Sequence, residues 1–109
     1  MDRRIEQRFD CADDVTISWT EKTGTRQHEA LLMNISRSGA RLLSATRVPV
    51  GADVTIAYPN GEFVGQVTHC LTRKPHHVLG VVFAPGFEWS RNIYCPKNAR
   101  GLGRLPKSA

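Results

Sequence analysis

The sequence predicts an all-β fold, a barrel of six short antiparallel strands. Apolar and polar residues alternate in several short segments, as they do along a strand that buries one face. Turn-forming residues separate these segments at short intervals. The 109 residues suit one domain with a single modest core, and closing the sheet into a barrel would remove its exposed edges.

The first half of the chain supplies three of the expected strands. Residues 15–19 alternate between apolar and polar types, which predicts a half-buried strand. Residues 30–35 form a more continuous apolar run, and residues 40–43 follow directly after Gly39. The asparagine, serine and glycine residues between the second and third segments are types that turns favour.

The second half supplies the other three strands. Residues 54–58 alternate again. Asn60 and Gly61 then predict a tight hairpin turn, because this pair tolerates the positive φ of such turns. Residues 62–71 continue as the fifth strand, and residues 78–83 form the sixth. Proline and glycine close this last strand.

Three details complete the expected fold. In the fifth strand, Val64 and Val67 are expected to point inward. After the sixth strand, residues 87–93 are compatible with a short C-terminal helix that Pro96 would stop, and the alternative is a flexible tail. Four large aromatic residues are expected in the core or at its rim: Trp19, Phe63, Phe83 and Trp89.

The net charge of +5 is unevenly distributed. Ten of the 15 basic residues and all ten acidic residues lie at or before Glu88, so the whole excess lies beyond it. A basic tail beside a neutral domain argues against a surface that tracks nucleic acid. The chain therefore divides into a flexible N-terminal arginine segment (1–12), the barrel (13–88) and a basic C-terminal extension (89–109).

The cysteine spacing and the hydropathy of the sequence favour a cytoplasmic location. The three cysteines lack C-x-x-C spacing, so no disulfide framework is expected and a reducing cytoplasm fits best. No apolar run approaches the ~20 residues of a membrane span. The N-terminus also lacks the apolar core of a secretory signal. We therefore expect a cytoplasmic protein without a membrane span.

The chain opens with an arginine pattern, R-x-x-x-R, formed by Arg4 and Arg8, with Arg3 directly before it. A guanidinium group is planar, permanently charged and rich in donors, so it can bind a phosphate at two points and stack on a base. The pattern therefore predicts a clamp for an anionic nucleotide. Considered alone, however, it fits a solvated charge run better.

The second pattern, N-x-S-x-x-G, lies where the second expected strand ends. Asn34 offers an amide that can read a purine edge, and Ser36 adds a hydroxyl for a phosphate or a base. Arg37 would supply a further cation, and Gly39 permits positive φ and a close approach of the ligand to the backbone. Alone, these residues fit a plain turn better. The joint occurrence of both patterns, about two dozen residues apart, favours a binding site.

Together the two patterns resemble the signature of PilZ domains, small β-barrels that bind the bacterial messenger cyclic di-GMP. The resemblance covers roughly residues 3–86, and residues 78–83 look like the final strand of that family. It implies that the arginines grip the phosphates and guanines of the ligand, and that the asparagine and serine contact guanine and phosphate. The implied ligand-binding residues are Arg3, Arg4, Arg8, Asn34, Ser36, Arg37 and Gly39.

The resemblance also implies a mode of binding and action. In that family, an arginine at the position of Arg3 accompanies two mutually intercalated ligand molecules. Asn34 stands where an aspartate is commoner, and a neutral amide forms a weaker hydrogen bond than a carboxylate. Residues 1–11 would be mobile without ligand and would be drawn onto the barrel by its phosphates. The protein would then act as a stand-alone adaptor that signals to a protein partner in motility, exopolysaccharide or biofilm control.

Other classes of function have less support in the sequence. No catalytic set of residues and no phosphate-binding G-x-x-x-x-G-K-[ST] loop occurs, so we expect neither an enzyme nor a cofactor. The spacings among His69, Cys70, His76, His77 and Cys95 match no usual zinc pattern, so no metal site is expected. Two alternatives stay open: a PilZ-like protein-interaction adaptor that binds no ligand, and a small basic barrel that binds single-stranded nucleic acid.

Overall fold

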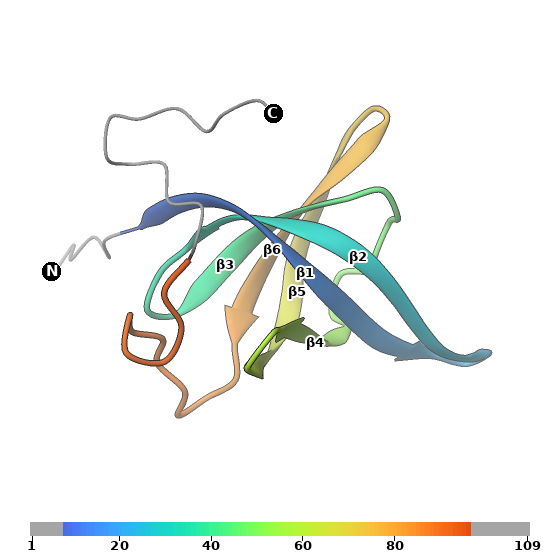
Figure 1. The fold of residues 1–109 in the computed structure, drawn as a ribbon. Helices are drawn as coiled ribbons and strands as arrows, with labels where there is room; N and C mark the ends of the chain where they lie inside the picture. Colours follow the sequence, from blue (N-terminus) through green and yellow to red (C-terminus); the bar gives the residue numbers. More distant parts are fainter. Residues whose placement is uncertain (1–7, 97–109) are drawn as a thin grey trace, which may run out of the picture.

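The computed structural model describes residues 8–96, and this part of the chain folds into a closed β-barrel (Figure 1). The predicted six-stranded all-β fold is confirmed. Its strands are β1 (Phe9–Glu21), β2 (Gly24–Ile35), β3 (Gly39–Ser44), β4 (Asp53–Tyr58), β5 (Gly61–Arg73) and β6 (His76–Phe83). All neighbouring strands are antiparallel, in the order β1-β2-β3-β6-β5-β4, and β4 pairs back to β1 to close the barrel.

Each expected strand lies within an observed strand, but the observed strands are longer. The β1–β2 and β5–β6 hairpins extend well beyond the barrel (Figure 1). Residues 22–27 and 71–76, at the ends of these hairpins, are exposed throughout. No face is buried there, so the alternation that predicts strands is missing. At its other end β1 begins at Phe9, within the segment 1–12, and Cys11 is already fully buried.

Inward-facing residues from all six strands form the core. The four aromatic residues expected there are each at most 4% exposed. In β5 the prediction was only partly right, because Val67 is 1% exposed but Val64 is 47% exposed. Side chains alternate along a strand, and the inward positions are taken by Phe63, Gly65 and Val67. Val64 therefore faces outward.

Two glycines that the sequence associates with positive φ are required for another reason. Neither Gly39 nor Gly61 has positive φ. A Cβ on Gly39 would lie 2.5 Å from the carbonyl oxygen of Val81, and one on Gly61 would lie 2.5 Å from the hydroxyl of Tyr58. The hairpin turn after β4 is confirmed, since Tyr58 pairs with Gly61 across it, but its expected backbone conformation was wrong. Both glycines make room for neighbouring atoms.

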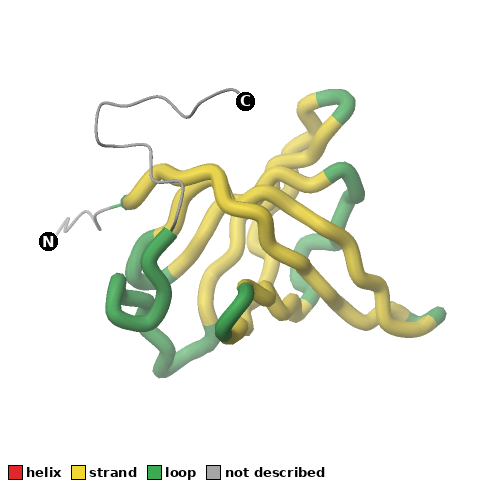
Figure 2. Tube along the Cα trace, viewed as in Figure 1, coloured by secondary structure: helices red, strands yellow, loops and turns green. Residues whose placement is uncertain are grey.

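Residues 84–96, hereafter the closing segment, contain turns and no helix (Figure 2). The short helix considered for residues 87–93 is therefore not formed. Phe87 and Trp89 both pack against the core. Two residues that are two positions apart do not face the same side of a helix, so a helix could not bury both rings. The closing segment lies against one end of the barrel (Figure 1).

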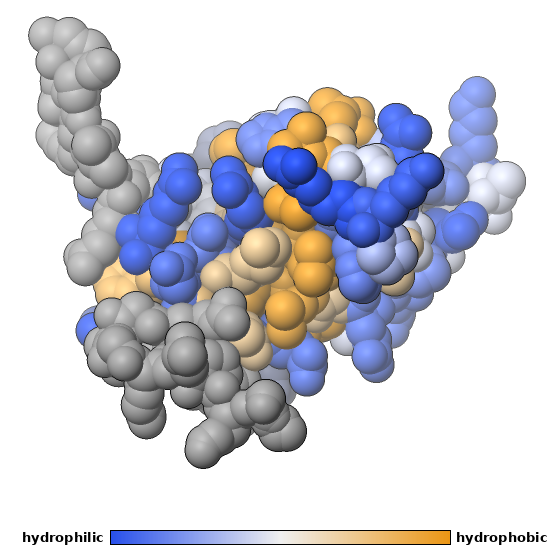
Figure 3. All heavy atoms as spheres, turned by 90° about the horizontal axis from the view of Figure 1, so that it is seen from above, coloured by the Kyte–Doolittle hydropathy of each residue, from blue (hydrophilic) through white to orange (hydrophobic). Residues whose placement is uncertain are grey.

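The outside of the barrel carries both polar and apolar side chains. On the face seen in Figure 3, hydrophilic side chains flank a band of apolar ones. Within residues 8–96, no helix has the length and apolar character needed to cross a membrane. The exposed large apolar residues of the described part are Val50, Val64, Leu71, Val82 and Ile93.

Candidate functional site

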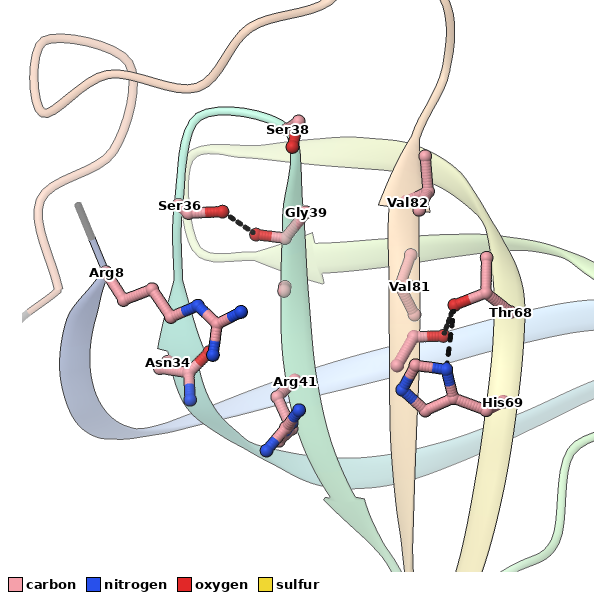
Figure 4. A pocket seen from close by; sticks show the side chains of 12 residues that line it. Arg8, Asn34, Ser36, Ser38, Gly39, Arg41, Thr68, His69, Val81 and Val82 are labelled. Atoms are coloured by element: carbon pink, nitrogen blue, oxygen red, sulfur yellow. Dashed lines mark hydrogen bonds between the residues drawn. The ribbon is translucent and has the colours of Figure 1, made fainter. Parts of the chain in front are cut away.

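A pocket on the outside of the barrel brings residues from both sequence patterns together. Its volume is about 530 Å³, within the range of pockets that hold small molecules. Residues of β2 and β3 form one side of it and residues of β5 and β6 the other (Figure 4). It is lined by Arg8, Asn34, Ser36, Ser38, Gly39, Ala40, Arg41, Thr68, His69, Gly80, Val81 and Val82.

Four of the seven predicted binding residues line this pocket, although the two patterns are separate in sequence. Arg37 is exposed and does not line it. Arg3 and Arg4 lie outside the described residues. The four that come together are Arg8, Asn34, Ser36 and Gly39.

A row of paired residues crosses the floor of the pocket, from β2 through β3 and β6 to β5. Asn34 pairs with Arg41, and Arg41 pairs with Gly80. Gly80 pairs in turn with His69. Paired residues on neighbouring strands point to the same face of a sheet. Gly80 contributes no side chain, and this leaves room for the His69 ring over its backbone.

Irregular strand pairing directs additional side chains into the pocket. The register of β5 against β6 shifts between Val67 and His69, and that of β2 against β3 shifts between Leu32 and Asn34. Such bulges interrupt the alternation of side chains along a strand and redirect them. Thr68 and His69 are consecutive, yet both line the pocket. Two pocket residues, Asn34 and His69, therefore stand directly after a shift in register.

The turn formed by residues 36–39, hereafter the motif turn, is held by its own hydrogen bonds. The backbone N–H of Ser36 donates to the carbonyl of Gly39 over 2.8 Å, and its hydroxyl donates to the same oxygen over 3.3 Å. Ser36 is only 9% exposed. The turn leads straight into β3, where the Gly39 backbone lies against Val81 of β6. Its shape is thus fixed before any ligand is present.

The closing segment and the end of β6 also support the motif turn from behind. The N–H of Trp89 donates to the carbonyl of Arg37 over 2.9 Å. The N–H of Phe83 donates to the carbonyl of Ser38 over 2.8 Å. Both carbonyls belong to the motif turn, so its position depends on the end of β6 and on the closing segment.

The closing segment holds the start of β1 as well. The ring of Phe9 lies 5.2 Å from that of Trp89, centroid to centroid, in an edge-to-face arrangement. The guanidinium carbon of Arg91 lies 5.5 Å from the centre of the Phe9 ring. Phe9 directly follows Arg8, so these contacts anchor the pocket arginine next to the motif turn.

The pocket is suited to an anionic, planar ligand. Among the described residues that line it, two carry guanidinium groups and none is acidic. Within residues 8–96, neither Arg8 nor Arg41 forms an ion pair, and the amide of Asn34 makes no hydrogen bond. These groups can therefore bind a phosphate or the edge of a base without first giving up a partner. The same part of the chain has no group of three or more His, Cys, Asp or Glu residues that could hold a metal ion.

Sequence reasoning did not predict eight of the twelve residues that line the pocket. Among these eight, four polar or glycine residues belong to neither pattern: Arg41, Thr68, His69 and Gly80. In the sequence analysis, His69 was considered only as a possible metal ligand. Strand register brings these four residues to the site, and register cannot be read from local composition. One usable signal was the glycine in residues 78–83, since a strand interior that contains glycine often marks a close approach.

Comparison with known proteins identifies the family and the fold. A family model described as PilZ domain matches residues 2–88. A solved structure of the PilZ domain of YcgR from Escherichia coli with c-di-GMP has a similar fold, with a TM-score of 0.58 and 16% sequence identity. That likeness covers 77% of this chain and 79% of the YcgR chain.

A second solved structure, the complex of K. pneumonia MrkH with c-di-GMP, gives a TM-score of 0.57 at 17% identity. The likeness covers 77% of this chain, which spans 45% of the MrkH chain. At such low identity these structures show the fold alone. No curated protein matches the sequence.

Proposed function

The chain belongs to the PilZ domain family, and on this premise we propose that it is a receptor for cyclic di-GMP. PilZ domains are non-catalytic receptors for this messenger. The observation that carries the proposal is the pocket in which Arg8 meets Asn34 and Ser36, one residue from the first pattern and two from the second. Its cationic lining matches the two phosphates of a cyclic dinucleotide.

The residues of the two sequence patterns have distinct roles in this proposal. The guanidinium of Arg8 binds a phosphate and stacks on a guanine, and the amide of Asn34 reads a guanine edge. The hydroxyl of Ser36 donates to the carbonyl of Gly39 in the free protein. It would turn that proton toward a phosphate when the ligand binds. Arg37, exposed beside the pocket, would add its charge at the rim.

We further propose that the ligand draws the residues that precede β1 onto the barrel, with Arg4 on its phosphates and Arg3 favouring a second, intercalated ligand. The exposed position of Arg8, at the start of β1, supports this order of events. Amide exchange across residues 2–8 should slow when ligand saturates the protein, because residues 9–11 already belong to β1. Unchanged exchange there would contradict the ordering, and a stoichiometry of one ligand per chain would contradict the role of Arg3.

The output of the proposed receptor is contact with a partner protein. Ordering of the residues that precede β1 beside the pocket would create a surface that exists only with ligand. Motility, exopolysaccharide synthesis and biofilm formation are the processes in which such an adaptor would act. Capture of a partner that requires cyclic di-GMP would support this role, whereas equal capture with and without ligand would favour an adaptor independent of the messenger.

Calorimetric titration with cyclic di-GMP tests the central proposal. We expect saturable binding in the micromolar range or tighter, about −8 kcal/mol or better. Arg8→Ala should abolish or strongly weaken it, while Arg73→Ala should not, because Arg73 is an exposed arginine outside the pocket. GMP, with one phosphate and one base, should bind much more weakly. Absence of saturable binding by the folded wild type would refute the proposal and favour the ligand-free adaptor.

A further inference from the structure

Among the described residues that line the pocket, only His69 combines an aromatic ring with a hydrogen-bonding edge, and neither sequence pattern includes it. We propose that His69 reads the guanine base of the ligand by accepting a hydrogen bond at Nε2. This inference rests on the proposed function and adds a specificity-determining residue to the same site. His69 is exposed and lines the pocket on the side opposite Arg8 and Asn34 (Figure 4).

The hydrogen bonds of Thr68 determine which ring nitrogen of His69 carries the proton. The hydroxyl of Thr68 lies 3.2 Å from the carbonyl oxygen of Gly80, which can only accept, so Thr68 donates its single proton there. The same hydroxyl lies 3.3 Å from Nδ1 of His69. Having no second proton, it accepts at that contact, and Nδ1 is the donor. In the neutral imidazole Nε2 is then an acceptor.

Gly80 places this acceptor over the floor of the pocket. A Cβ at position 80 would overlap the His69 ring, and Nε2 is the ring atom that it would meet first. The ring therefore lies across Gly80, its partner on β6. In Figure 4 the ring nitrogen that is not bonded to Thr68 faces the strand that carries Arg41. A base lying between Arg41 and His69 would thus meet a donor on one side and an acceptor on the other.

This pairing of donor and acceptor selects guanine over adenine. Guanine presents acceptors at O6 and N7, which suit the guanidinium of Arg41, and N–H donors at N1 and N2, which suit Nε2 of His69. Adenine carries a donor amino group in place of O6 and an acceptor at N1. It would therefore set a donor against Arg41 and a lone pair against His69. A mismatched buried polar edge is poorly tolerated in a binding site.

The test compares cyclic di-GMP with cyclic di-AMP, which share a phosphate backbone and differ in the bases. His69→Phe keeps a ring but removes the acceptor, and it should weaken cyclic di-GMP binding by about three- to tenfold, the worth of one neutral hydrogen bond. Binding of cyclic di-AMP should change little, so the ratio of the affinities for cyclic di-GMP and cyclic di-AMP should fall. His69→Gln, whose amide oxygen can accept, should recover part of that preference.

The matched control is His76→Phe, because His76 is an exposed histidine of β6 outside the pocket. It should leave both affinities unchanged, and thermal unfolding should confirm that every variant is folded. Wild-type affinity and preference in His69→Phe would overturn the role of His69 while leaving the receptor intact. Failure of the wild type to bind cyclic di-GMP would instead overturn the receptor itself, and this inference with it.

Discussion

The pocket and the closing segment lie on either side of the motif turn, and they use polar groups in opposite ways. In the closing segment the polar groups are bonded: Trp89 donates from its indole to the carbonyl of Tyr94 over 2.9 Å, and the Tyr94 hydroxyl donates to Asp13. In the pocket, Arg8 and Arg41 make no ion pair within residues 8–96.

Because of this difference, we expect the closing segment to contribute to the stability of the fold and the pocket to contribute to ligand binding. A polar group buried without a partner is costly, so the interior contacts of the closing segment must be satisfied within the protein. Arg8 is exposed, and Asn34 and Arg41 are half-buried, so water can satisfy these groups until a ligand replaces it. Substitutions in the closing segment should therefore change the free energy of unfolding, and substitutions in the pocket should change affinity.

The largest effect is expected for Trp89→Ala. Trp89 is 4% exposed and packs against Phe9. Losing a buried large aromatic side chain costs about 3–5 kcal/mol of unfolding free energy. Urea titration measures the loss, and Ile93→Ala, at an exposed residue of the same segment, should stay within about 0.5 kcal/mol of wild type. A Trp89→Ala protein as stable as wild type would show that the closing segment does not stabilise the barrel.

Arg41→Ala should weaken ligand binding and leave the stability of the fold nearly unchanged, the opposite of what we expect for Trp89→Ala. Its guanidinium lines the pocket without an ion pair in the described part of the chain. We expect unfolding free energy within about 0.5 kcal/mol of wild type. Affinity for cyclic di-GMP should fall by about 1.5–3 kcal/mol, the worth of a hydrogen bond to a charged group. Calorimetry measures this loss, with Arg47→Ala as the exposed control outside the pocket. Unchanged affinity would remove Arg41 from the site.

The smallest effect is expected for Tyr94→Phe, and it depends on pH. Removing the hydrogen bond to Asp13 should cost about 1 kcal/mol near neutral pH. Burial, and then the hydrogen bond and the charge of Asp13, raise the pKa of Tyr94 above its usual value of 10.0. The unfolded chain therefore loses this proton at a lower pH than the folded chain does.

The sign of the pH effect follows from this order of proton loss. The contribution of Tyr94 is fully present below about pH 10 and is lost as the pH rises further. Urea titrations between pH 8 and about 11 should show wild type losing more stability than Tyr94→Phe. Parallel curves for the two proteins would contradict the raised pKa.

Sequence reasoning found the parts of the strands that bury one face and missed the hairpin ends that bury none. Residues 15–19 alternate because Ile17 and Trp19 point into the core, and their strand was predicted. Residues 22–27, at the end of the β1–β2 hairpin, are exposed throughout, so this part of the hairpin carries no hydrophobic pattern. The position of the turn at Asn60 was predictable from its residue types. The outward orientation of Val64 was not, because it depends on register.

The site was predictable where it lies on contiguous patterns and unpredictable where it depends on pairing between distant strands. Asn34, Ser36 and Gly39 lie within one short motif. His69 reaches the same pocket only because β5 pairs with β6 and a register shift follows Val67. Nothing in the local sequence around His69 records that geometry.

The contact between Phe9 and Trp89 has a practical consequence for spectroscopy. Phe9 follows Arg8, so movement of the pocket arginine should alter the surroundings of an indole that emits light when excited in the ultraviolet. The other indole, Trp19, stacks at 5.6 Å on His28 of the β1–β2 hairpin, away from the pocket. A Trp19→Phe protein would carry one emitter beside the first residue of the clamp. Its fluorescence would follow occupancy of the pocket in real time, without an attached dye.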